Sequence, residues 1–153
     1  MISYDKLLLT KADDRELVSL VALSTIWAEE KTMPSYHPNV AEDFLNRELY
    51  VARSGDDIIA YALGDIVEST EKTSYHSIGE KTFKLDELYV VSAYRNHGVG
   101  RELYRFLEED LKAEVQVLSV VAATHNYQDL LRFYIEELGM TFNHALLVKR
   151  LDT

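Results

Sequence analysis

The sequence predicts a single α/β domain, residues 1–153, in which helices flank a mixed central sheet. A strand, two helices and a run of strands are predicted first, and helices alternate with single strands in the last third of the chain. Two consecutive strands around a short turn indicate antiparallel pairing, and a later strand–helix–strand unit indicates a parallel crossover. At 153 residues the chain is long enough to bury one core without disulfides or metals.

The first third of the chain is predicted to form a strand followed by two helices. KLLLT, residues 6–10, is apolar enough for a strand. Asp13 or Asp14 is a suitable N-cap for a helix that runs to about residue 30, with apolar residues at helical spacing. MPSYHPN contains both prolines of the chain and breaks this helix. VAEDFLNR, residues 40–47, is predicted as a short second helix.

The middle of the chain is predicted to contribute three strands. Residues 49–67 read as two strands around a Ser-Gly-Asp-Asp turn, which is a hairpin signal. Residues 68–82 are polar and without periodicity, so we expect a loop or a strand extension. FKLDELYVV, residues 83–91, is the third strand.

The last third is predicted to alternate between helices and strands. Residues 98–113 form an amphipathic helix, and the β-branched run at 115–124 is predicted as a buried strand. Residues 126–138 form another amphipathic helix that ends at Gly139. HALLVKRL, residues 144–151, is predicted to close the sheet as its last strand.

Composition excludes several classes of function. The net charge is −10 and no basic stripe is visible, so a duplex nucleic-acid binder is not expected. No apolar run approaches the ~18 residues of a membrane span, and the N-terminus lacks the pattern of a signal peptide. We therefore expect a cytoplasmic protein that does not associate with membranes.

Residue types also limit the chemistry. The chain has no cysteine, which excludes thiolate zinc sites and a cysteinyl-enzyme intermediate. The five histidines show neither HxH nor HxxxH spacing, so no metal site is expected. An acidic protein attracts cations at long range, which is compatible with a basic substrate.

A glycine-containing turn, YRNHGVGR, stands between a predicted strand and a predicted helix. The first turn of a helix leaves backbone N–H groups unpaired and favours anions, and glycines let the backbone approach a bulky phosphate. Arg95, His97 and Arg101 flank Gly98 and Gly100, although cations at this end of a helix are unfavourable without an anion between them. The turn therefore predicts a phosphate-bearing ligand, and its spacing matches neither a P-loop nor a dinucleotide fingerprint.

The segment LYVVSAYRNHGVGREL resembles the acetyl-coenzyme A (acetyl-CoA) signature of the GNAT superfamily of N-acetyltransferases, an apolar strand followed by [QR]-x-x-G-x-[GA] and a helix. Its positions are filled by Arg95, Asn96, His97, Gly98, Val99 and Gly100. The order of elements matches that family along essentially the whole chain, so the resemblance implies a GNAT-like fold with acetyl-CoA as co-substrate. It also implies that backbone amides at about 95–101 bind the pyrophosphate, with Arg101 at their end. Backbone groups near Val90 and Val91 would then hold the pantetheine arm and the acetyl carbonyl.

Acetyl transfer to an amine needs a proton acceptor for the amine and a proton donor for the leaving thiolate. Because there is no cysteine, we expect direct attack by the amine. Asp86 and Glu87 are the candidate bases, and strand alternation predicts that they face opposite sides, Asp86 with Leu88 and Glu87 with Tyr89. Asp86 matches the base position of polyamine-type acetyltransferases, which favours it slightly, and both residues remain candidates.

Tyr134 is the candidate acid. The segment NYQDLLRFYIEELGM resembles the second motif of the family, an Asn, then a helix that carries a tyrosine, then Gly. The spacing on each side of Tyr134 is one residue longer than is common, which turns the side chain by ~100° unless a π-bulge compensates. Asn126 is a candidate contact for the pantetheine amides.

The acceptor is predicted to be a small cationic amine, such as a polyamine, an amino acid derivative or an aminoglycoside. Carboxylates and aromatic residues are mixed in two regions that would select it, residues 27–40 and 68–82. A protein lysine or N-terminal acetyltransferase and a non-catalytic CoA-binding sensor are the alternatives. The resemblance also suggests a homodimer. The apolar final strand, Ala145 to Val148, either pairs across its interface or lies in the sheet of its own chain.

Overall fold

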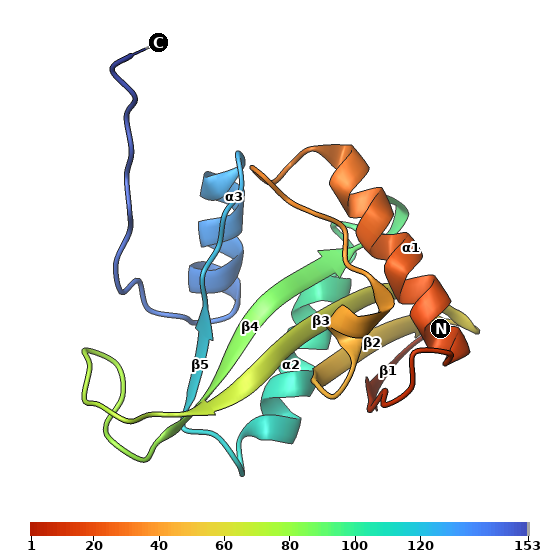
Figure 1. Ribbon diagram of the computed structural model, residues 1–153, viewed down its shortest axis with the longest axis horizontal. Helices are drawn as coiled ribbons and strands as arrows, with labels where there is room; N and C mark the ends of the chain where they lie inside the picture. The colour runs from red at the N-terminus through yellow and green to blue at the C-terminus, as the bar shows by residue number, and fades with distance from the viewer. Residues whose placement is uncertain (153) are drawn as a thin grey trace.

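The computed structural model describes residues 1–152 and contains a five-stranded sheet in the order β1-β2-β3-β4-β5 (Figure 1). Neighbouring strands are antiparallel except β4 and β5, which are parallel. The predicted mixed α/β fold is therefore confirmed. The strands are β1 (Ile2–Leu7), β2 (Glu48–Ser54), β3 (Asp57–Glu68), β4 (Lys81–Val90) and β5 (Val117–Val120).

Helices cover both faces of the sheet (Figure 1). α1 (Arg15–Glu30) begins at Asp14, whose side chain accepts a hydrogen bond from the Glu16 N–H at 2.9 Å. This N-cap satisfies one of the unpaired donors of the first turn. The helix buries Leu17, Leu20 and Leu23 against one face of the sheet, and Lys31 ends it in the left-handed conformation.

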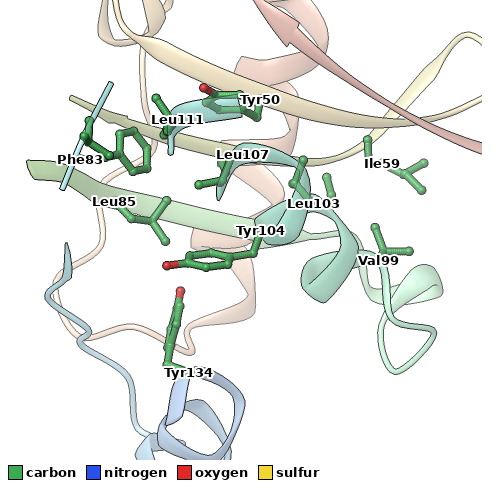
Figure 2. Packing of buried hydrophobic residues seen from close by; sticks show 14 residues of the cluster. Tyr50, Ile59, Phe83, Leu85, Val99, Leu103, Tyr104, Leu107, Leu111 and Tyr134 are labelled. Atoms are coloured by element: carbon green, nitrogen blue, oxygen red, sulfur yellow. The ribbon is translucent and has the colours of Figure 1, made fainter. Parts of the chain in front are cut away.

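α2 (Val99–Leu111) covers the other face. Its buried residues recur at helical spacing and pack against Tyr50, Phe83 and Leu85 of the strands (Figure 2). Complete burial of a leucine contributes about 1.5–3 kcal/mol, so this stripe is a major source of stability. The buried residues of the helix are Val99, Leu103, Tyr104, Leu107 and Leu111.

The chain after β5 forms α3 (Tyr127–Leu131), which continues without interruption into the π-helical segment η3 (Arg132–Glu137). Gly139, at φ 73°, follows the end of this helix as predicted. Within residues 1–152, no helix combines the length and the apolar character that a membrane crossing requires.

Several predicted boundaries were wrong. The first strand begins at Ile2 and ends at Leu7, because its pairing with β2 rather than the KLLLT run fixes it. VAEDFLNR forms only the 3-10 turn η1 (Ala41–Phe44), and β5 is shorter than the predicted run. The predicted closing strand at 144–151 is not formed, because this segment pairs with no strand and extends away from the body (Figure 1).

Candidate active site

A cleft opens where β4 and β5 diverge. Their parallel ladder ends at the Leu85–Val120 pair, although β4 continues to Val90. The edge of β4 that faces β5 therefore offers unpaired backbone groups, which is the surface that an extended ligand can join as an additional strand. A cavity of about 290 Å³ occupies this opening. Its lining includes Trp27, Glu30, Leu88, Tyr89, Val90, Ala123, Thr124, Phe133 and Tyr134.

A second and larger cavity, of about 800 Å³, adjoins the first at the start of α2. Both cavities share Val90, Arg95, Gly100 and Phe133 in their walls. The loop that follows β4 lines the second cavity, and among residues 1–152 its N–H groups from Asn96 to Arg101 donate to no protein backbone acceptor. Consecutive unpaired N–H groups at a helix N-terminus form a site for a phosphate.

Glycines give this loop its shape. Gly98 is the N-cap of α2 at φ 80°, and Asn96 also has a positive φ of 62°. A side chain is strained in this conformation, which only glycine adopts without cost. Gly100 serves another purpose, because a Cβ atom there would lie 3.5 Å from Val90 and 3.6 Å from Phe133, on the wall shared by both cavities.

The basic residues of the loop have separate environments. The Arg101 guanidinium forms ion pairs beside the loop, with its Nε 3.5 Å from Glu102 and its Nη1 3.7 Å from Glu137, and its buried Nε–H makes no hydrogen bond among the described residues. Arg95 instead turns into the first cavity, where both Glu30 carboxylate oxygens accept from its guanidinium at 2.7 Å. Its Nε–H also donates to the Val90 carbonyl at 2.9 Å.

Glu30 belongs to a wall of the first cavity that combines a carboxylate with aromatic rings. Trp27 and Tyr89 stack with ring centroids 5.1 Å apart, and the Tyr89 hydroxyl donates to Glu30 at 3.1 Å. Burial, together with the charge of Glu30, raises the pKa of Tyr89 to about 12. The guanidinium of Arg95 lies 5.4 Å from the Tyr89 centroid, which is within the range of a cation–π contact. The wall thus already holds one cation of the protein itself.

A β-bulge at Asp86 places the two candidate bases, Asp86 and Glu87, in different surroundings. Leu63 pairs with Glu87 and Gly64 pairs with Leu85, so Asp86 is the extra residue of β4. The predicted alternation holds for Glu87 and Tyr89 but was wrong for Asp86, because the bulge releases Asp86 from the strand pattern. The Asp86 carboxylate forms an ion pair with Arg47, which also binds Asp65 at 2.6 Å.

Glu87 lies on the α1 side of the sheet under a layer of aromatic side chains. Its Oε1 accepts hydrogen bonds from Tyr61 at 2.6 Å, from Asn39 at 2.8 Å and from Tyr36 at 3.4 Å. Burial raises the pKa of the Glu87 carboxyl above its ordinary value, although these three donors oppose the effect. Among residues 1–152, no donor contacts its Oε2.

Tyr134 lies in the π-helical segment η3, in which the Leu138 N–H bonds the Phe133 carbonyl at 3.1 Å. The spacing on each side of Tyr134 is one residue longer than is common, and the π-helical turn that compensates for it is therefore present at this position. Tyr134 lines the first cavity, and its hydroxyl points toward that of Tyr104 (Figure 2). Burial raises the pKa of the Tyr134 hydroxyl, so the group stays protonated at neutral pH.

Val91 and Asn126, which were also predicted as site residues, line neither cavity. The Val91 N–H donates to Ile59 and its carbonyl accepts from Tyr94, so its backbone is already paired. The Asn126 side chain donates to Asp129 at 2.8 Å. The loop at 68–82 connects β3 to the start of β4, at the opposite end of β4 from the glycine turn (Figure 1). No residue of 68–82 lines either cavity, and the expectation that this loop selects the acceptor stays a prediction.

Sequence reasoning missed Asn39, Tyr61 and Arg47, which determine the surroundings of Glu87 and Asp86. Tyr61 lies on β3, which pairs with β4, so knowledge of the register between these two strands would have placed it near Glu87. Asn39 comes from the proline-broken segment after α1, whose path no periodicity indicates.

The model of the Acetyltransferase (GNAT) family matches residues 14–140, and the chain belongs to this family. No curated protein matches the sequence. An aminoglycoside acetyltransferase, meta-AAC0020, from an uncultured soil metagenomic sample aligns at a TM-score of 0.71 and 15% identity. That alignment covers 99% of this chain and 97% of the other.

Two further solved structures show the same fold. The ribosomal-protein-alanine N-acetyltransferase of Brucella melitensis biovar Abortus 2308 aligns at a TM-score of 0.69 and 18% identity, over 99% of this chain and 100% of the other. The aminoglycoside N-acetyltransferase AAC(6')-Iy, solved in complex with CoA, aligns at 0.68 and 12% identity, over 100% and 96%. At these identities the likeness extends to the fold alone.

The family uses acetyl-CoA, and the residues present fit this group. The loop supplies backbone N–H groups that donate to no protein backbone acceptor and are free for the pyrophosphate. The unpaired edge of β4 supplies backbone groups for an extended chain. Within residues 1–152 no cluster of three or more His, Asp or Glu side chains is arranged to hold a metal ion.

Proposed function

We propose that this protein transfers the acetyl group of acetyl-CoA directly to the primary amine of a small cationic acceptor. One observation carries the proposal: the phosphate-binding loop, the free edge of β4 and the cation-binding wall line two adjoining cavities. Acetyl-CoA supplies an acetyl group activated as a thioester. The remaining steps are assigned to groups of this chain.

The loop from Asn96 to Arg101 binds the pyrophosphate through its backbone N–H groups. Val90 offers its backbone to the pantetheine arm, and Arg95 must then leave the Val90 carbonyl, to which it now donates. Gly100 keeps the passage between the two cavities open, because it adds no side chain between Val90 and Phe133.

Glu87 accepts the proton of the attacking amine through a water molecule, because the residue is half-buried and does not line the cavity itself. Its raised pKa makes it a stronger base than an ordinary carboxylate. Asp86 is disfavoured for this role because the Arg47 ion pair stabilises its charge. Tyr134, which lines the cavity, donates a proton to the leaving thiolate.

Glu30 and the Trp27–Tyr89 pair recognise the positive charge of the acceptor. The Arg95 guanidinium already contacts the Glu30 carboxylate and the Tyr89 ring, and this supports the proposal that these groups are arranged for a cation. Two of the similar solved structures are aminoglycoside acetyltransferases, which act on polycationic amines. Glu29 is exposed on α1 and lines neither cavity.

A second candidate activity is acetylation of a protein lysine or N-terminus, and the similar alanine N-acetyltransferase favours it. A non-catalytic CoA-binding sensor is the third candidate. We place the protein in the cytoplasm in all three cases, because acetyl-CoA is an intracellular metabolite.

The experiment that tests the proposal is a panel of amines and peptides monitored for release of free CoA thiol. We expect turnover of small cationic amines, with a KM at least about tenfold higher in Glu30→Gln, which is about 1.4 kcal/mol of lost binding. Glu29→Gln is the matched control and should leave KM unchanged. Turnover of peptides alone would support the second candidate, and acetyl-CoA binding without any turnover would support the third.

A further inference from the structure

Ser24 is a fully buried polar residue of α1, and the proposed mechanism does not use it. A serine or threonine inside a helix commonly turns its hydroxyl back to the carbonyl four residues earlier, as Thr25 does to Val21 at 3.0 Å. The Ser24 hydroxyl instead contacts the chain that follows α1, residues 32–39, which we call the 32–39 segment. Its role is therefore to be sought in that segment rather than in the helix.

Ser24 holds the 32–39 segment at two points. Its Oγ accepts a hydrogen bond from the Asn39 backbone N–H at 2.7 Å and lies 2.6 Å from the Tyr36 hydroxyl. Among the described residues, no backbone N–H of 32–39 donates to a backbone carbonyl, so regular secondary structure does not fix this segment. Side-chain contacts must set its path, and two of them converge on the Ser24 hydroxyl.

The two residues that Ser24 holds are also donors to Glu87. The Asn39 side chain reaches Oε1 of Glu87 at 2.8 Å, and the Tyr36 hydroxyl reaches the same oxygen at 3.4 Å. Tyr36 has a single hydroxyl hydrogen, which points to Glu87, so the Ser24 hydroxyl is the donor in its contact with Tyr36. Tyr61 supplies the third donor from β3, independently of the segment.

We propose that Ser24 is a positioning residue for the candidate base: by holding Asn39 and Tyr36, it directs their donors onto Oε1 of Glu87. Oε2, which no donor contacts among residues 1–152, is then the oxygen that takes the proton. This catalytic role rests on the proposed function, whereas the hydrogen bonds do not. Donors to the charged form of a carboxylate lower its pKa, so Ser24 sets the pH above which Glu87 can act as a base.

The other groups that act on Glu87 keep one protonation state near neutral pH. Burial raises the pKa of both Tyr61 and Tyr36, so both hydroxyls stay protonated. The charge of Arg47 lowers the pKa of Glu87, and hydrogen bonds to two carboxylates raise the pKa of Arg47 itself, which keeps it charged. A rise in the Glu87 pKa on substitution of Ser24 therefore reports lost donors.

The first test measures the Glu87 pKa by NMR titration of the side-chain carboxyl carbons of the full-length protein without acetyl-CoA. Glu87→Gln identifies the signal by its loss. Ser24→Ala should raise this pKa by about one unit, as the strength of a hydrogen bond to a charged group implies. Thr25→Val is the matched control, because it removes an exposed hydroxyl of the same helix and should leave the pKa unchanged. An unchanged or lowered pKa in Ser24→Ala would overturn the proposal.

A second variant, Asn39→Ala, tests the same chain of contacts from outside the helix and does not require Ser24→Ala to fold. It removes one of the two donors that Ser24 holds, so it should also raise the Glu87 pKa, and no rise would overturn the proposal. Because Ser24 acts through Asn39, the shift caused by Ser24→Ala should fall to about half in the Asn39→Ala background. Full additivity of the two shifts would mean that Ser24 does not act through Asn39, against the proposal.

Thiol release separates this positioning role from the proposed function. With Glu87 as the base, Ser24→Ala should move the acidic limb of kcat/KM upward with the pKa, so that the rate falls about tenfold below the limb and stays unchanged on the plateau. A merely structural defect would lower both. A Glu87 pKa that rises while the limb does not move would support the positioning of Glu87 by Ser24 and contradict Glu87 as the base.

Discussion

Replacing Glu87 by glutamine tests the assignment of the proton acceptor with little change in shape. The amide oxygen of glutamine can still accept from Tyr61, Asn39 and Tyr36, so the contacts that position the side chain persist. The substitution removes only the ability to take a proton at this position.

The expected loss follows from the value of a positioned base. General base catalysis contributes roughly 10²–10⁴-fold in rate, or about 2.7–5.5 kcal/mol of transition-state stabilisation. Because Glu87 acts through water rather than by direct contact, we expect kcat to fall about 10²-fold, at the lower end of this range. The affinity for acetyl-CoA should change by less than about threefold, since Glu87 lines neither cavity.

The assay is thiol release at saturating acetyl-CoA, measured as a function of pH. In the wild type, kcat/KM should rise with pH through the raised pKa of Glu87 and show no fall near neutrality, because Tyr134 also has a raised pKa and stays protonated. Glu87→Gln should lose the acidic limb. Asp86→Asn is the control and should keep it. An unchanged rate and pH profile in Glu87→Gln would refute the assignment, and loss of the limb in Asp86→Asn would transfer the role to Asp86.

Three further predictions concern the acid, the loop and the core. Tyr134→Phe keeps the ring packing against Tyr104, so kcat should fall about 10²-fold while the acetyl-CoA dissociation constant, measured by calorimetry, stays within about threefold; a normal kcat would exclude Tyr134 as the acid. Gly98→Ala adds a side chain at φ 80°, which costs about 1–2 kcal/mol. Calorimetry should therefore show the affinity for acetyl-CoA reduced about tenfold. Full affinity would mean that binding does not require the shape of the loop. Leu103→Ala empties a fully buried position and should lower the unfolding free energy in urea by about 2–5 kcal/mol, and a smaller loss would mean that α2 collapses onto the gap.

Glu87→Gln should lower kcat but raise the stability of the folded protein at high pH. Because the folded-state pKa of Glu87 is raised, its contribution to stability is fully present below the unfolded pKa and is lost as pH rises through the folded value. Glutamine imitates the protonated form at every pH. Glu87→Gln should therefore melt at a higher temperature than the wild type at pH 8 and at a similar temperature at pH 4, and a lower Tm at pH 8 would contradict the raised pKa.

The parts of the fold that the sequence predicted are those in which local pattern and tertiary packing agree. The periodicity of α2, the hairpin turn between β2 and β3 and the apolar run of β4 each placed an element correctly. The glycine turn also predicted the unpaired N–H groups of the loop, because only local backbone geometry was needed.

The sequence could not predict features that depend on neighbouring strands. The bulge at Asp86 arises from pairing between β3 and β4, and it decides which carboxylate is buried. The ion pair of Arg95 with Glu30 joins residues 65 positions apart. Residues 144–151 have the pattern of a strand, but a strand forms only where another strand edge pairs with it, and this segment pairs with none.

Binding of acetyl-CoA is the central claim, and a thermal-shift titration tests it most directly, with ATP at matched ionic strength as control. At a ligand concentration 100 times the dissociation constant, binding stabilises the folded state by about 2.7 kcal/mol. For a domain of this size that corresponds to a rise in Tm of roughly 5–10 °C. We predict a saturable rise that ATP does not reproduce. No shift at millimolar acetyl-CoA would contradict the account, and the glycine turn would then serve only the packing of α2.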